Sequence, residues 1–504
     1  MKLLQCASID GIEAYCVDVE ASFTKGLPGF SIVGLANSSI QESKERVKSA
    51  LISNEFKFPP LKITINLSPS DLPNKTGSHF DLPIALLIAL QNKTVNFEDF
   101  FVLGELGLDG KLKDTSSIFV ILLSLVKQGK VKNILVPKDS VEKLSFIPNI
   151  DIYAVDTLQD AIAFFESEDR SKYKVSEKSK FDYKWIEVAG EKFYYTKDFE
   201  LDFNDVKGQN LAKKAAMISA AGLHNIIFNG SPGCGKSMIT KRMQYILPPM
   251  SINEILEKVK IQLLEGDAPE FIPNRIFRSP HHTSTKASIF GGGSANAKIG
   301  EVALANNGIL FFDELPHFSK VTLEALREPL EDHKILVSRV NNKINYPSKF
   351  LFVGAQNPCP CGNLLSNLKE CRCNDLEIQR YKNKLSDPFL DRIDLHVIMN
   401  DTNYEEASSL TSEDIFKKII EAFKMQKQRG QKELNGKLDE KSIEQFCVLN
   451  DELKTILNRA ISEFSLSLRA INKVIKVSRT IADLEQSEVI EKRHLLESFS
   501  YRFR

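Results

Sequence analysis

The 504-residue chain has no excess charge of either sign, because its 66 lysines and arginines balance 66 aspartates and glutamates. Global attraction to a polyanion is therefore excluded, and any nucleic-acid site must be local. The opening residues, MKLLQCASIDG, contain too short an apolar stretch for a signal peptide. The longest apolar runs, such as IFVILLSLV at 118–126, fall well short of the ~20 residues of a membrane helix. We expect a cytoplasmic protein with no membrane contact.

No repeat with a period of 20–50 residues is visible. Changes in the pattern of apolar and charged residues instead divide the sequence into regions. Residues 1–165 alternate short β-branched runs with apolar helical stretches, which predicts an α/β domain. Residues 166–197 are charged and without sustained periodicity, which predicts a linker. A second α/β domain is expected over 198–400. Apolar residues spaced i, i+3, i+4 predict a helical domain over 401–504.

One motif predicts a nucleotide site. NIIFNGSPGCGKSM, at 225–238, has a buried strand, a glycine-rich turn and the start of a helix, and it contains the whole G-x-x-x-x-G-K-S pattern. Glycines let backbone N–H groups surround phosphates, Lys236 would reach the β- and γ-phosphates of ATP, and Ser237 would hold Mg²⁺. The predicted nucleotide-binding residues are Gly230, Ser231, Pro232, Gly233, Cys234, Gly235, Lys236, Ser237 and Met238.

Two later apolar strands end in polar residues suited to hydrolysis. NNGILFFDELPHF delivers Asp313, which would hold Mg²⁺ through water, and Glu314, which would polarise the attacking water. Alone, this pattern is often just a strand reaching the surface; downstream of a P-loop it indicates a catalytic strand. SKFLFVGAQNP puts Asn357 at its tip, where an AAA+ ATPase has the sensor 1 residue that orients the water.

Two arginines are candidates only if the chain is of the AAA+ class. Arg392, in DPFLDRIDLHV, would be an arginine finger that acts in the ATP site of a neighbouring subunit. Arg469, in SLSLRAINK, would be the sensor 2 residue that contacts the γ-phosphate. A single arginine is usually part of a surface salt bridge, so both assignments depend on the class and not on spacing alone.

Half of the eight cysteines lie in AQNPCPCGNLLSNLKECRC, directly after the Asn357 strand. Cys359, Cys361, Cys371 and Cys373 would form a closed, structural tetrahedral Zn²⁺ site, although Cys-x-Cys is tighter than the usual Cys-x-x-Cys spacing. A disulfide and simple packing remain alternatives. Packing explains poorly why four thiols gather beside proline, arginine, glutamate and lysine.

The motifs are similar to those of a known bacterial family. VKGQNLAKKAAMISAAGLHNIIFNGSPGCGKSM, FRSPHHTSTKASIFGGG, LREPLEDHKILVSR and AQNPCPCG resemble the ComM/YifB family of magnesium-chelatase-like AAA+ proteins, and so do NLSPSDLPNKTGSHFDLPIAL and RTIADLEQSEVIEKRHLLESFSYR. The resemblance covers the chain except for the linker. It implies a Lon-like (ribosomal S5-type) N-terminal domain, an AAA+ core and a helical lid.

In function, the resemblance implies a hexameric ATP-driven helicase that promotes DNA branch migration during natural transformation, with single-stranded or branched DNA and recombination proteins as partners. Two positions depart from the family pattern. Ile299 stands where proline is common, and Ser237 stands where threonine is common. Neither departure removes a chemical group that ATP hydrolysis needs.

Two polar segments are candidates for DNA contact. FRSPHHTSTKASIFGGGSANAKIG resembles an insert that projects into the pore of related rings. Its two histidines, His281 and His282, could be metal ligands, but with no third ligand nearby they are expected to pack or hydrogen-bond within the insert. HKILVSRVNNKINYPSK predicts a β-hairpin. Six copies would concentrate positive charge in one channel. The alternative is that these residues are ordinary exposed cations. The candidate DNA contacts are Lys286, Lys298, Lys334, Arg339 and Lys343, with Lys349 beside them.

Four other functions compete with the DNA motor. A Lon-type protease is disfavoured because Ser78, in KTGSHFDLP, has no dyad lysine after GELGLDGKLKD. A metal-chelatase motor subunit is disfavoured by the fused N-terminal domain and the four cysteines. A scaffold that only binds ATP conflicts with the intact Asp313–Glu314 pair. A protein remodeller would need aromatic pore residues, and in the insert only Phe290 qualifies.

Overall fold

The computed structural model describes residues 2–70, 75–176, 179, 181–292, 298–338, 343–401, 410–464 and 466–502. They form two compact units: Met1–Asp182 with Val259–Phe271, and Tyr183–Lys258 with Ile272–Arg504. None of the described helices combines the length and the apolar character needed to cross a membrane.

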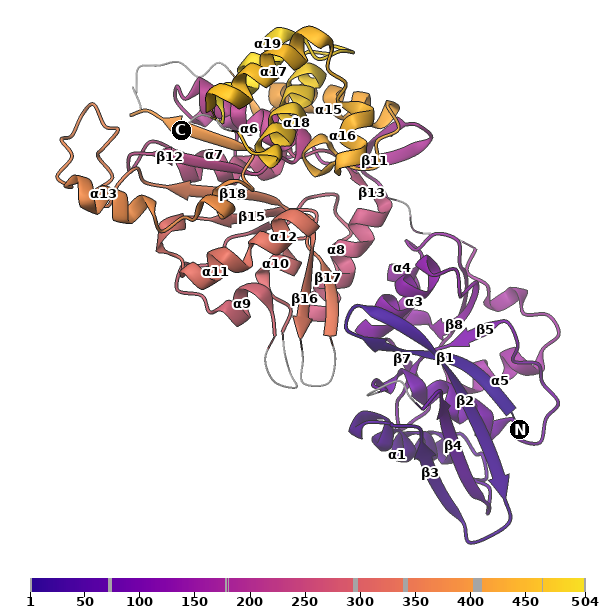
Figure 1. Cartoon of the computed structure of the whole chain (residues 1–504). Helices are drawn as coiled ribbons and strands as arrows, with labels where there is room; N and C mark the ends of the chain where they lie inside the picture. The colour runs from indigo at the N-terminus through magenta and orange to yellow at the C-terminus, as the bar shows by residue number, and fades with distance from the viewer. Residues whose placement is uncertain are drawn as a thin grey trace. The chain divides into compact units, whose positions relative to one another are not determined.

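The described part of the first unit is an α/β domain built on a seven-stranded sheet (Figure 1). The sheet order is β3-β4-β2-β1-β5-β8-β9; β1 pairs antiparallel with β2 and β2 with β4, while the other pairs are parallel. A small pair, β6 and β7, lies outside it. The elements are β1 Lys2–Asp10, β2 Glu13–Thr24, β3 Gly29–Val33, α1 Ser38–Ser53, β4 Lys62–Ser68, α2 Asp81–Ala89, β5 Phe100–Val102, β6 Glu105–Leu106, β7 Leu112–Lys113, α3 Ser116–Lys127, β8 Asn133–Pro137, α4 Val141–Leu144, β9 Asp151–Val155 and α5 Leu158–Glu166.

A segment far along the chain, Val259–Phe271, completes this first unit. Phe271 stacks on Phe146 with 4.2 Å between ring centroids, and it meets Phe119 edge-on at 5.8 Å. Both arrangements are favourable for aromatic rings. Local periodicity cannot reveal this contact, because it joins residues more than 100 positions apart.

The interval 166–197, predicted as a linker, is only partly one. The division between the two units falls inside it, but β10 (Lys184–Val188) and β11 (Glu191–Tyr195) form an antiparallel hairpin that β13 (Met250–Ser251) extends. Phe193 of this hairpin is buried and meets Phe423 edge-on at 4.9 Å. The charged residues of the hairpin are exposed and outnumber its buried residues. For this reason the sequence pattern did not indicate a strand here.

The second unit is built on a parallel five-stranded sheet in the order β14-β15-β18-β12-β19. One sheet face packs on α6, α7, α15 and α18, with Phe228, Val353 and Val397 in the shared core. The other face carries Phe312, which stacks on Phe318 at 4.1 Å. The elements are α6 Asn210–Gly222, β12 Ile226–Gly230, α7 Lys236–Met243, α8 Ile252–Glu265, β14 Phe277–Arg278, α9 Lys286–Phe290, α10 Glu301–Leu304, β15 Ile309–Phe312, α11 Lys320–Ala325, α12 Arg327–Asp332, β16 Lys334–Ser338, β17 Lys343–Pro347, β18 Leu351–Gln356, α13 Asp375–Lys382, α14 Asp387–Leu390 and β19 Leu395–Met399.

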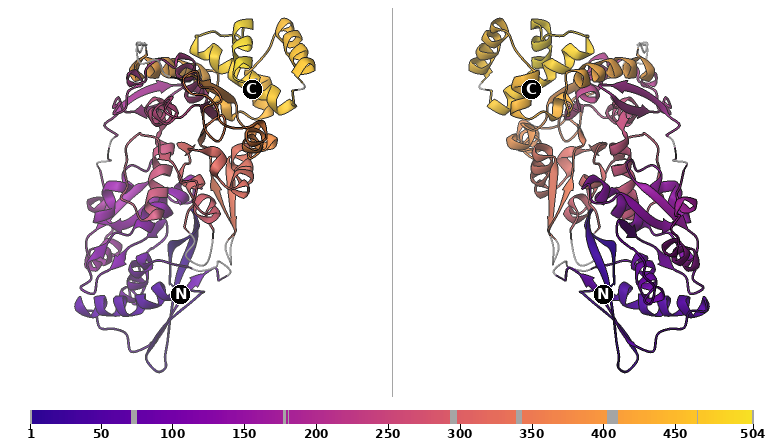
Figure 2. Two further views of the ribbon diagram at one scale, coloured as in Figure 1. Left: turned by 90° about the vertical axis from the view of Figure 1, so that its left-hand side faces the viewer. Right: turned by 90° about the vertical axis from the view of Figure 1, so that its right-hand side faces the viewer.

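The described residues after 410 are helical, as the apolar spacing predicts. Figure 2 shows the last of these helices in yellow, gathered at the C-terminal part of the second unit. The helices are α15 Ser412–Gln428, α16 Glu440–Phe446, α17 Asp451–Phe464, α18 Leu468–Leu484 and α19 Lys492–Ser500. Leu453, Leu457, Val474 and Leu495 belong to a second core that holds this lid together.

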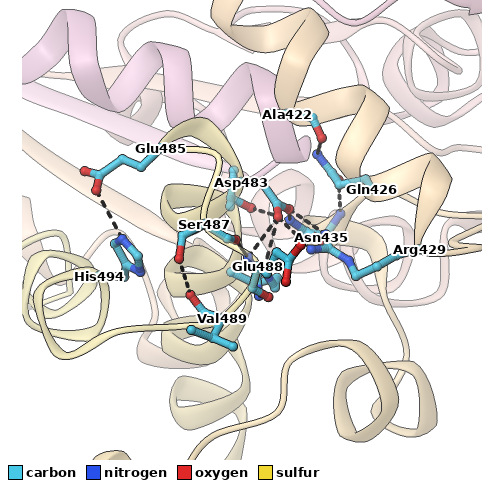
Figure 3. A network of polar contacts seen from close by, with 12 residues as sticks. Ala422, Gln426, Arg429, Asn435, Asp483, Glu485, Ser487, Glu488, Val489 and His494 are labelled. Carbon is cyan, nitrogen blue, oxygen red and sulfur yellow. Dashed lines mark hydrogen bonds and ion pairs between the residues drawn. The ribbon is translucent and has the colours of Figure 1, made fainter.

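A buried polar network inside the lid joins α18 to the segment that follows α15 (Figure 3). The Asp483 carboxylate accepts two hydrogen bonds of 2.7 Å from Arg429 and one of 2.8 Å from Asn435. Arg479 donates to the same carboxylate at 3.2 Å. Asp483 is fully buried, so these donors replace the water it has lost.

Candidate active site

The P-loop turn joins β12 directly to α7. Gly233 and Gly235 have φ angles of +83° and +97°, which glycine adopts at low cost. A side chain at Gly230 would bring its Cβ to 2.7 Å from the Met399 carbonyl oxygen. Cys234 is buried in the core, so it fills space rather than facing a ligand. The local geometry therefore requires the glycines of the motif.

Lys236 lies where the P-loop meets the tip of β18. Its ammonium donates to the carbonyl oxygens of Gly230 and Ser231 at 2.6 and 2.9 Å, and to Asn357 Oδ1 at 3.1 Å. Burial lowers the pKa of Lys236, while the Cys234 thiol and the Asp313 carboxylate act to raise it. Because β12 and β18 are parallel neighbours, the two polar residues meet at one sheet edge. The structure thus brings together Lys236 and Asn357.

Ser237 and Asp313 also meet at this edge. The Ser237 hydroxyl donates to Asp313 Oδ2 at 3.0 Å. Two oxygens at neighbouring corners of a Mg²⁺ octahedron, with bonds of about 2.0–2.1 Å, lie about 3 Å apart. The 3.0 Å separation of the pair fits two adjacent positions around one Mg²⁺ ion that binds both oxygens directly.

Glu314 is next to Asp313 but points to a different partner. Its backbone has φ of +50°, and its N–H donates to Asp313 Oδ1 at 2.9 Å. Its carboxylate lies 3.6 Å from His282 Nδ1 and is 56% exposed, so a water molecule can reach it. His281 bonds Thr283 within the insert, as expected, whereas the contact of His282 with Glu314 was not predicted. The parallel pairing of β14 with β15 brings the residues that follow the two strands to the same edge of the sheet. That pairing could have indicated the contact between His282 and Glu314.

The two candidate arginines do not lie at the P-loop; both lie at Glu331 on α12. The Arg392 side chain is only 9% exposed, bonds the carbonyl oxygens of Arg327 and Pro388, and pairs with Glu331. Arg469 reaches the other oxygen of the same carboxylate at 2.8 Å. Within one chain both arginines therefore pair with Glu331, and their roles as an arginine finger in a neighbouring subunit and as sensor 2 stay predictions.

The four clustered cysteines converge. All four sulfur atoms lie within 4.8 Å of one another. Cys359 is 3.4 Å from Cys361 and 3.7 Å from Cys371, and Cys361 is 3.6 Å from Cys371. Sulfur atoms around a tetrahedral ion with 2.3 Å bonds would be about 3.8 Å apart. The sulfurs are too far apart for disulfides, all four thiols are free, and the arrangement fits one tetrahedral metal ion.

Among the candidate DNA contacts, Lys286 begins α9, Lys334 and Lys343 lie on the hairpin of β16 and β17, and Lys298 lies between α9 and α10. Helix α9 and the hairpin lie side by side in Figure 1. A Cβ atom added at Gly291 or at Gly292 would lie within 4 Å of the Val337 side chain. The insert therefore packs on the hairpin. Lys349 instead pairs with Glu433 at 2.5 Å. Arg339 falls outside the described residues. The exposed candidates are Lys286, Lys298, Lys334 and Lys343.

In the N-terminal unit, Ser78 is not arranged as a nucleophile. Its hydroxyl donates to the Glu105 carboxylate. Phe119, in the segment where a dyad lysine was sought, is fully buried in α3. A carboxylate partner and a phenylalanine do not supply the base of a serine–lysine dyad. The geometry agrees with the rejection of proteolysis.

Comparisons with known proteins cover nearly the whole chain. The family described as magnesium chelatase, subunit ChlI, matches residues 202–407, and models of the same subunit match 19–140 and, as its C-terminal part, 409–502. Competence protein ComM of Haemophilus influenzae is 35% identical over 98% of this chain and 95% of its own. Proteins called YifB from Salmonella typhimurium and Escherichia coli are each 37% identical, with the same coverage. The chain therefore belongs to the ComM/YifB family of magnesium-chelatase-like AAA+ proteins.

Proposed function

We propose that this protein hydrolyses ATP as a ring of six copies and uses the energy to move along or remodel DNA. Its biological reaction is branch migration during the recombination of transforming DNA. The observation that carries the ATPase part is the convergence of Lys236, Ser237, Asp313 and Asn357 at one sheet edge. The name of the Haemophilus influenzae relative, a competence protein, supports the biological setting.

Each residue of the site has a separate task in hydrolysis. Lys236 neutralises charge on the β- and γ-phosphates, and Ser237 and Asp313 hold the Mg²⁺ ion that supplies further positive charge. Glu314 takes a proton from the attacking water, and Asn357 orients that water through its amide. The exposed lysines on α9 and the hairpin supply phosphate contacts to DNA, which carry no sequence preference.

DNA stimulation of ATP turnover tests this function. We expect turnover of the full chain to rise with single-stranded DNA or a synthetic four-way junction. Lys236→Ala should reduce turnover by roughly 100-fold or more under every condition, because it removes the cation at the transferred phosphate. Turnover is measured as phosphate release with and without each DNA. Turnover that no DNA changes would contradict a DNA motor.

A metal-chelatase motor subunit is the second candidate, because the matching family models are described as a chelatase subunit. It predicts ATP turnover that is indifferent to DNA. A protein remodeller is not a further candidate, because it would need exposed aromatic residues in the pore. Phe290, the aromatic residue singled out in the insert, is only 5% exposed. The DNA-stimulation experiment therefore separates the two candidates.

We further propose that the four-cysteine site holds a structural Zn²⁺ ion, since four thiolates leave no coordination position for substrate. The purified wild-type chain should contain about one zinc per chain, and Cys371→Ser should lose it, because three thiolates bind more weakly. Cys16→Ser, at a cysteine outside the cluster, is the matched control and should retain zinc. Elemental analysis measures the metal; wild-type protein without zinc would contradict the assignment.

A further inference from the structure

The loop that carries the four cysteines has little packing of its own. Residues 358–374 connect β18 to α13 and contain turns but no helix or strand. Leu364 and Leu368 are 37% and 77% exposed. Behind the loop is a cavity of about 360 Å³, lined by Asn357, Pro358 and Leu364 among others. A loop that covers a cavity and buries few apolar groups needs another source of order.

This loop nevertheless contacts the P-loop. Gly362 has φ of +83°, and a Cβ atom there would lie 2.5 Å from Cδ of Pro232 and 3.8 Å from Cγ of Asn357. Its backbone is thus in direct contact with the middle of the phosphate-binding turn. The same short stretch lies beside the side chain that meets Lys236.

The middle of the loop is attached beyond the end of a third strand. The Ser366 hydroxyl and the Asn367 N–H donate to the Asp401 carboxylate at 2.7 and 2.8 Å, just beyond the end of β19. Near the cluster, the Cys361 N–H points at the Cys373 sulfur at 3.4 Å. The loop therefore spans the ends of β18, β12 and β19, and the four thiols bring its own two ends together.

We propose that the four-thiolate centre is a positioning element for ATP hydrolysis: bound metal fixes loop 358–374, so that Gly362 supports Pro232 and Asn357 stays against Lys236. The proposal rests on the ATPase and zinc assignments above. Metal binding stabilises the ordered form of a segment that its own contacts do not order. Small displacements of positioned groups reduce the rate of hydrolysis far more than they reduce binding. Loss of metal should therefore lower kcat and leave nucleotide affinity nearly unchanged.

The first test separates kcat from binding. Cys371→Ser should lower kcat by roughly 10- to 100-fold, while the Kd for a fluorescent ATP analogue changes by less than about threefold, equivalent to under 1 kcal/mol. Cys16→Ser should change neither quantity. Full kcat in metal-free Cys371→Ser protein would overturn the proposal.

A second variant separates the contact from loss of the metal. Gly362→Ala should retain zinc but lower kcat, because its new methyl group displaces Pro232. Adding Pro232→Ala should restore kcat to the value of Pro232→Ala alone if the contact is responsible. Backbone strain at residue 362 would persist in the double variant. If kcat is not restored, strain and not the contact with Pro232 lowers it, and the contact argument is overturned.

A third readout does not depend on turnover. Hydrogen exchange of the full chain is followed before and after removal of the metal with a chelator. The amides of residues 230, 231, 233–237 and 354–357 should exchange faster without metal, while β15 serves as the internal reference. Unchanged exchange at the P-loop would overturn the positioning role even in an active ATPase. Metal-dependent exchange in a protein that never hydrolyses ATP would instead contradict the proposed function alone.

Discussion

Replacing Glu314 with glutamine is expected to reduce ATP turnover by roughly 100-fold or more, because glutamine cannot accept the proton of the attacking water. Nucleotide binding should persist. Glu314 bonds neither Lys236 nor Ser237, and its exposed carboxylate makes a side-chain contact with His282 instead. Steady-state phosphate release and titration with a fluorescent ATP analogue measure the two quantities separately.

Glu413→Gln is the matched control for this change. Glu413 is a half-exposed glutamate on α15 that pairs with Lys197 and Lys417, and its replacement should leave turnover unchanged. Should Glu314→Gln turn over ATP like the wild type, Glu314 would not be the base. The chain would then be better explained as a scaffold that only binds nucleotide.

The second large effect concerns the lid. Asp483→Ala should lower the free energy of unfolding of the second unit by about 3–5 kcal/mol, the range for removing one partner of a buried ion pair. Asp483 is fully buried and its arginine partner Arg479 is 3% exposed, so the change leaves a buried cation without its carboxylate. Burial already lowers the pKa of Arg479, while the Asp483 carboxylate acts to raise it.

Urea unfolding measures this change. The single tryptophan, Trp185, lies on β10 in the same unit as Asp483, so its fluorescence reports on that unit. The urea midpoint should fall by roughly 1–2 M. Asp451→Ala is the control, because that carboxylate is fully exposed and pairs only loosely with Lys454. Equal midpoints for Asp483→Ala and the wild type would show that the network does not stabilise the lid.

The sequence predicted those parts of the site that lie on consecutive residues after a strand. The P-loop, Asp313 and Asn357 each follow an apolar strand, and parallel strands bring such residues to one edge, so their meeting could be expected. The contact of His282 with Glu314 was missed because the insert follows a strand of only two residues, which leaves little apolar signal.

Other features depend on contacts between distant segments. Glu331 was not singled out, because it lies in a charged stretch that looks like any exposed helix, and its two arginine partners lie 61 and 138 positions further on. The β10–β11 hairpin was read as a linker because its exposed lysines and glutamates outnumber its buried residues. The α/β and helical regions were predictable, since their apolar periodicity extends over whole elements.

One carboxylate joins the lid to the core. Glu331 offers one oxygen to Arg392 in the core and the other to Arg469 on α18, and Lys473 of α18 holds the carbonyl oxygen of Arg392 at 3.0 Å. A guanidinium binds a carboxylate and a phosphate with similar geometry, so Glu331 occupies the two arginines in the way that a phosphate could. An anion that displaced Glu331 from Arg469 would remove one of these ties, while Lys473 would still hold the core through Arg392 and Asp394.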